Sequence, residues 1–184
     1  MKMRTCLSIL AFLGIAMVGG CAMGNKSAMD QLTPEHRAAI RRLLDATGAA
    51  DIAVKNMHAR LKALAAQDPA VSEVVYDSLK LVDEDYMTEK MTPVYARYFD
   101  TENAVEIAKF YERKTGRKYA DLAARRDIPS SKYNRYLTYK EKVELERFFA
   151  SDAGRLMVDV APDINKALKE LGKEIGDELS RTAQ

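Results

Sequence analysis

The chain has 184 residues, which is enough for one domain and too few for two of ordinary size. Hydrophobic residues make up 47% of it and charged residues 30%, a globular balance that excludes a disordered chain. The formal net charge of +2 becomes 2 − 2 = 0 if Lys2 and Arg4 are removed with the leader described next, so the composition gives no support for nucleic-acid binding.

The first 20 residues have the pattern of an export signal. Two cations, at positions 2 and 4, precede an apolar stretch over residues 7–18 that is shorter than the ~20 apolar residues of a membrane span. Two glycines and Cys21 follow this stretch. The order resembles the lipobox of bacterial lipoproteins, which implies that residues 1–20 are a lipoprotein signal peptide and that Cys21 becomes a triacylated, palmitate-bearing N-terminus. The alternative is an ordinary secretory signal that is cut nearby, with Cys21 incidental.

The cysteines and the residue after Cys21 indicate the compartment. The only other cysteine, Cys6, lies in the predicted signal peptide, so the remaining chain is expected to form no internal disulfide. Each buried CH₂ of an acyl chain contributes ~0.8 kcal/mol, and several chains together anchor a protein stably in a membrane. Ala22 stands where an aspartate signals inner-membrane retention in enteric-type sorting. This resemblance implies the bacterial cell envelope, at the outer membrane and facing the periplasm.

Residues 21–31 are predicted to be a small, polar, lipidated tether, and residues 32–184 a single helical domain. Within the domain, prolines mark helix boundaries, because a proline at the first helical position has no N–H to lose and the side chain before it can cap the helix. The pattern predicts helix starts at Thr33-Pro34, Asp68-Pro69 and Thr92-Pro93, and breaks at Pro129 and Pro162.

Apolar residues between these marks recur at helical spacing. Helices are predicted over residues 34–47, 51–66, 69–82, 84–99, 102–114, 117–126, 139–151 and 163–180. Gly48 is expected to end the first of them, and Thr138 and Glu141 have capping-box spacing. The last helix carries one apolar stripe, made of Ile164, Leu168, Leu171, Ile175 and Leu179. No segment alternates with period two between hairpin turns, so the predicted fold class is all-α, a single compact multi-helix domain.

A shift of 38 positions aligns residues 95–122 with residues 133–160, with nine identities over 28 positions and no gap. We therefore expect an internal duplication of a helix–turn–helix unit, with both copies packed in one core. The residues expected to face inward on the first helix of each copy are Ile107, Phe110 and Tyr111, and Leu145, Phe148 and Phe149. The residues expected to close over them from the second helix are Tyr119 and Leu122, and Met157 and Val160.

Two further features recur in both copies. Gly116 and Gly154 are expected to end the first helix with a positive φ, which costs glycine least. Charged pairs at i, i+4 are expected on the surface, namely Arg117 with Asp121 and Arg155 with Asp159.

The sequence contains a short motif that begins with Tyr-x-x-x-Phe. Further on it has an aromatic pair, four intervening residues, and then a glycine followed by a basic residue. It is carried here by Tyr95, Phe99, Phe110-Tyr111 and Gly116-Arg117. The motif resembles the bacterial domain of unknown function 2059, and residues 40–53 are similar to the leading segment of that family. Phe148-Phe149 with Gly154-Arg155 is a second, more divergent copy, and Thr115 and Ala153 stand where the family often has proline. The resemblance implies an exported helical protein of about this length, and it brings no assigned activity, catalytic residue or cofactor.

Charge is unevenly distributed along the domain. Residues 73–102 hold eight acids against three bases, a sum of 3 − 8 = −5. Residues 109–126 hold seven bases against two acids, a sum of 7 − 2 = +5. One interpretation is two solvated faces that complement each other, and the other is a basic patch for anionic lipid headgroups.

No constellation of an enzyme site is evident. The only histidines, His36 and His58, are 58 − 36 = 22 positions apart, which is not the spacing of a metal site. We therefore expect no enzyme activity, no catalytic residue, no cofactor and no metal, with a hydrolase as the least favoured reading. The favoured function is a protein-interaction or scaffolding module with an envelope protein as partner, tethered to the membrane by lipid. The alternative is a carrier or sensor of a small apolar or lipidic ligand.

Overall fold

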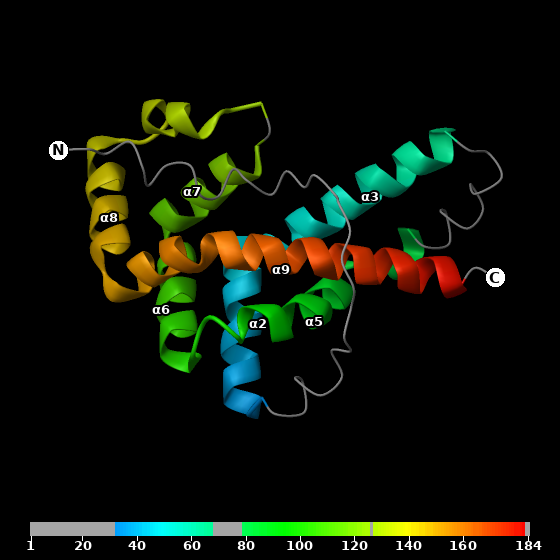
Figure 1. Cartoon of the computed structure of the whole chain (residues 1–184). Helices are drawn as coiled ribbons and strands as arrows, with labels where there is room; N and C mark the ends of the chain where they lie inside the picture. Colours follow the sequence, from blue (N-terminus) through cyan, green and yellow to red (C-terminus); the bar gives the residue numbers. More distant parts are fainter. Residues whose placement is uncertain (1–31, 68–78, 126, 183–184) are drawn as a thin grey trace.

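The computed structural model describes residues 32–67, 79–125 and 127–182, and Figure 1 shows the whole chain. Three predicted features lie outside these residues. They are the signal peptide at 1–20, the tether at 21–31 with Cys21, and the helix start at Asp68-Pro69 with most of the helix predicted at 69–82.

The described residues form helices and no strand, which confirms the predicted all-α class. The helices are α2 (Pro34–Thr47), α3 (Ala49–Gln67), α5 (Glu84–Tyr95), α6 (Thr101–Tyr111), α7 (Lys114–Ala124), the 3-10 helix η4 (Ser130–Arg135), α8 (Tyr139–Ala150) and α9 (Asp152–Thr182). Figure 1 shows α2 packed along α6, while α9 crosses these helices and continues beside α5. None of the described helices combines the length and the apolar character that a bilayer span requires.

Three helix ends follow the predicted chemistry. The Thr33 hydroxyl accepts from the His36 backbone N–H in front of Pro34, and Gly48 ends α2 in the left-handed region at φ 66°. Thr138 and Glu141 form the complete capping box of α8, each side chain accepting from the other's backbone N–H. A helix boundary can therefore be predicted from the sequence where local capping, such as a hydrogen bond from a nearby side chain, determines it.

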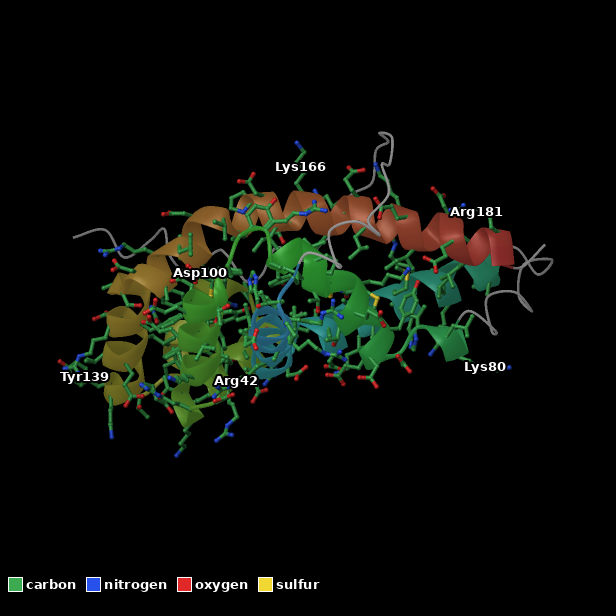
Figure 2. The ribbon with its side chains drawn as sticks, turned by 90° about the horizontal axis from the view of Figure 1, so that it is seen from below. Arg42, Lys80, Asp100, Tyr139, Lys166 and Arg181 are labelled. Atoms are coloured by element: carbon green, nitrogen blue, oxygen red, sulfur yellow. The ribbon has the colours of Figure 1, made fainter. Side chains whose placement is uncertain are left out.

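Two proline predictions were wrong. Thr92-Pro93 does not start a helix, because Asp83 caps α5 ten residues earlier and Pro93 lies buried inside that helix. The Thr92 hydroxyl instead donates to the Thr88 carbonyl, one turn back, at 2.7 Å. Pro162 lies inside α9, which begins at Asp152, and Figure 2 shows α9 as one continuous, curved helix.

The reason for the continuity of α9 is its apolar stripe. Ile164, Leu168, Leu171, Ile175 and Leu179 are all at most 9% exposed, as the stripe predicted. An internal proline costs a helix ~3 kcal/mol, whereas each fully buried aliphatic side chain contributes ~1.5–3 kcal/mol. Burial of five such residues outweighs one missing hydrogen bond.

A candidate binding groove between α6 and α8

The chain forms two helix–turn–helix units, α6–α7 and the start of α8–α9. Their elements begin at matching positions: α6 at 101 and α8 at 101 + 38 = 139, then α7 at 114 and α9 at 114 + 38 = 152. The N-caps, Asp100 and Thr138, have the same offset, and the side chain of each accepts from the backbone N–H three residues on. Figure 1 shows α6 and α8 running in opposite directions.

Gly116 and Gly154 keep the units tight, but not in the predicted way. Neither has a positive φ; both lie in the first turn of the second helix instead of ending the first. A Cβ on Gly116 would lie 2.6 Å from the Tyr111 Cα, and one on Gly154 would lie 2.9 Å from the Phe149 Cα. In both cases the carbonyl oxygen at the end of the first helix would be closer still. The glycines are needed because two backbones touch here.

An aromatic cluster joins the units. The rings of Phe110 and Phe148 stack with their centroids 3.9 Å apart and their planes 2° from parallel. The Tyr111 ring meets Phe148 edge-on at 6.0 Å, and the Tyr119 ring meets Phe149 at 5.7 Å. Of the residues predicted to face inward, Ile107, Phe110, Tyr111, Tyr119, Leu122, Leu145 and Phe148 are buried, and Phe149, Met157 and Val160 are half-buried.

A solvent-open groove of about 640 Å³ lies above this stack. Its lining consists of Glu106, Lys109, Phe110, Arg113, Lys114, Thr115, Glu144, Arg147, Phe148 and Ser151. Four pairs among them are separated by the same 38 positions: Glu106/Glu144, Lys109/Arg147, Phe110/Phe148 and Arg113/Ser151. The stacked rings form the floor, and each unit contributes one wall.

The groove is basic. Lys109, Arg113, Lys114 and Arg147 are exposed, and none of their side chains donates a hydrogen bond to, or forms an ion pair with, another residue in the described ranges. Two glutamates oppose these four cations, giving 4 − 2 = +2, and Glu144 is already engaged as the acceptor of the Thr115 hydroxyl. The cations are therefore available to an external anion.

A second polar contact fixes α7 against α8 beside the groove. Lys118 Nζ donates to Glu141 Oε2 at 2.8 Å, and the Thr138 backbone N–H donates to the same oxygen at 2.7 Å. These two bonds lower the pKa of Glu141 to about 2, with Lys118 the larger cause, so the carboxylate stays ionised at neutral pH.

The arginine–aspartate pairs predicted in the two aligned segments do not form. Arg155 pairs with Asp152, which precedes it by three residues, instead of with Asp159. No ion pair among the described residues joins Arg117 to Asp121. The acidic stretch 73–102 and the basic stretch 109–126 are likewise not joined by any ion pair within the described ranges.

The side chains of the two histidines form hydrogen bonds with backbone carbonyls. His36 Nε2 lies 2.7 Å from the Phe99 carbonyl oxygen, and His58 Nε2 lies 2.8 Å from the Val82 carbonyl oxygen. Both contacts tie one helix to the segment before another and need a protonated Nε2. In the described part of the chain, no three His, Cys, Asp or Glu side chains gather in a way that could hold a metal ion.

Two other hollows differ from the groove in character. An apolar cavity of about 70 Å³ lies between α2, α5 and α9, lined by Leu43, Tyr95, Phe99, Met157, Ile164 and Leu168 among others. Burial raises the pKa of Tyr95 to about 12, in keeping with this apolar setting. A surface hollow of about 780 Å³ surrounds Arg42 and Glu112, whose fork-to-carboxylate pair at 2.6 Å neutralises both charges.

Residues 85–124, which cover α5 to α7, match the model of the family described as an uncharacterized protein conserved in bacteria (DUF2059). This match confirms the resemblance expected from the aromatic and glycine motif. No curated protein matches the chain. No solved structure matches it either.

Proposed function

We propose that this chain is a bacterial envelope lipoprotein whose helical domain is a protein-interaction module, with the groove between α6 and α8 as its docking site. The single observation that carries the proposal is a groove of about 640 Å³ whose four exposed cations form no side-chain hydrogen bond or ion pair among the described residues. An apolar floor edged by charges has the layout of a protein interface, in which an apolar core is surrounded by a polar rim. Charges of this kind select a partner by complementarity.

The anchor part of the proposal rests on the sequence pattern before Cys21. The family matched by residues 85–124 is described as conserved in bacteria, which is the setting in which such a cysteine is acylated. Acyl chains on Cys21 would hold the domain at the periplasmic face of the outer membrane, where an envelope protein is the natural partner.

The apolar cavity argues against the carrier alternative. Its volume of about 70 Å³ is several-fold smaller than that of an ordinary small-molecule site. Small-molecule sites commonly enclose about 300–1,000 Å³ of mostly apolar space. The groove has that size, but six of its ten lining residues are charged and it is open to solvent.

We propose further that the two helix–turn–helix units are an internal repeat, which would explain how the groove arose. Matching element starts and the two glycine–carbonyl approaches support this reading. Duplication of a unit with a cation before its aromatic residue places Lys109 and Arg147 on opposite walls of one groove.

Cys21→Ala tests the anchor. We expect the wild-type protein to fractionate with membranes and into the detergent phase, and the variant to be released or to accumulate with its leader uncut, because acylation precedes cleavage in lipoprotein processing. The measurement is the intact mass of the purified N-terminus. An unmodified N-terminus at a residue other than 21 would contradict the lipoprotein proposal.

Photo-crosslinking in living cells tests the docking site. A photoreactive amino acid replacing Lys114, at the groove, is expected to capture a discrete partner, whereas the same amino acid replacing Lys166, on α9, is not. The captured product should be lost when Lys109→Glu and Arg147→Glu are introduced into the same chain. Equal capture from both positions, or capture that ignores the charge reversal, would count against the groove.

A further inference from the structure

We infer that the groove between α6 and α8 takes an extended acidic peptide, in which carboxylates flank an apolar side chain. This inference rests on the proposed function and names the chemistry of the partner at that site.

The positions of the cations in the groove favour a ligand with more than one carboxylate. Lys109 and Arg147 lie on opposite walls, and Arg113 and Lys114 add two cations where α6 passes into α7. A single anion placed against one wall would leave the cations of the other wall unpaired. Arginine binds a carboxylate through two parallel hydrogen bonds and lysine through a point charge, so both walls suit side-chain carboxylates.

The apolar floor of the groove determines which kind of side chain fits between the carboxylates of the peptide. Phe110 and Phe148 are only 6% and 7% exposed, so they present a narrow apolar strip and no deep slot. An aliphatic side chain fits across such a strip, whereas an acyl chain has nowhere to enter. Helices α6 and α8 run in opposite directions along the two sides of the groove (Figure 1). A peptide segment laid through the groove therefore contacts both walls.

The concave shape distinguishes a peptide from a membrane surface. Anionic headgroups form a layer, and a layer meets cations on a convex or flat face. Here the cations line a hollow of about 640 Å³, which a headgroup layer does not fill but a short peptide segment does.

The test uses the full-length protein and two fluorescein-labelled pentapeptides, Glu-Glu-Leu-Glu-Glu and its glutamine counterpart Gln-Gln-Leu-Gln-Gln, with fluorescence anisotropy as readout. We expect the glutamate peptide to bind about tenfold or more tightly than the glutamine peptide, since complementary charges provide the discrimination. Its binding should weaken as salt is raised, because exposed charges are screened.

Lys109→Glu/Arg147→Glu is expected to weaken binding of the glutamate peptide about tenfold or more, because like charges then face each other. The matched control is Lys166→Glu/Arg181→Glu, which makes the same change of charge. Figure 2 shows Lys166 pointing outward from α9, and Arg181 is exposed near the end of that helix, where its side chain donates to the Asp177 carbonyl. The control should bind within about twofold of wild type, because neither control residue lines the groove. If the groove variant loses helical circular dichroism, Lys109→Gln/Arg147→Gln replaces it.

Three results would overturn the inference. The first is equal binding of the two peptides, and the second is binding of the groove variant at the level of the control. The third is binding of phosphatidylglycerol vesicles to wild type and not to the groove variant, together with no binding of the glutamate peptide. If groove-dependent photo-crosslinking persists in any of these cases, the interaction module stands and only its acidic partner is wrong. If crosslinking at position 114 also fails, both proposals fall.

Discussion

Gly154→Ala is expected to lower the free energy of unfolding by about 3 kcal/mol, although alanine is the better helix former. The added Cβ would lie 2.7 Å from the Phe148 carbonyl carbon and 2.9 Å from the Phe149 Cα. Both are backbone atoms at the end of α8, so no rotamer change relieves the contact. Helix α9 would have to move away from α8, which would loosen the packing of the rings beneath the groove.

The control for this prediction lies in the same helix. Gly172 is also inside α9, but a Cβ built on it meets nothing within 4 Å. Gly172→Ala should therefore stabilise the protein by about 0.5–1 kcal/mol, since alanine has less backbone entropy to lose. Urea unfolding followed by circular dichroism measures both changes. A Gly154→Ala variant as stable as Gly172→Ala would show that the two backbones do not touch at this position.

These glycines also show what the sequence predicts and what it leaves out. The 38-residue offset identified Gly116 and Gly154 as equivalent and structurally required. It did not say why, because a glycine after an apolar helix fits a left-handed cap and a close backbone approach equally well. Gly48, which lies outside the two aligned segments, is the one glycine in the described residues that takes the left-handed conformation.

The prolines were misread for a related physical reason. The rule that proline starts or breaks a helix counts one missing hydrogen bond and local sterics. Pro93 and Pro162 are tolerated because long-range burial holds their helices together, and such burial is invisible to a local pattern. Pro34 was read correctly because its cap, Thr33, is its neighbour in the sequence.

The groove is the part of the candidate site that the sequence could not locate. Its two walls come from helices that begin 38 residues apart in the sequence. They lie side by side because α7 and η4 lead the chain back so that α8 packs beside α6. A signal was nevertheless present, since Lys109 aligns with Arg147 at the 38-residue offset and both precede a phenylalanine. Positions that are charged in both aligned segments, next to a core aromatic residue in each, indicate where two similar units face each other.

Phe148→Ala is expected to lower the free energy of unfolding by about 3–5 kcal/mol, the cost of a large cavity at a buried aromatic position. Phe110→Ala should cost a similar amount, because the two rings are equally buried and stack on each other at 3.9 Å. Tyr139→Ala is the control: this aromatic residue is 84% exposed, and its loss should change stability by less than about 0.5 kcal/mol.

The double variant Phe110→Ala/Phe148→Ala decides whether the stack acts as one unit. Once the first ring is gone, the second has lost its partner, so removing it costs less than in the wild-type protein. The cost of the double variant should therefore fall short of the sum of the single costs by about 0.5–1.5 kcal/mol, the coupling typical of an aromatic pair. Guanidinium unfolding of the four proteins, wild type included, completes the cycle. Strict additivity would mean that each ring is held by its own helix–turn–helix unit, and that the two units meet at the groove without stabilising each other there.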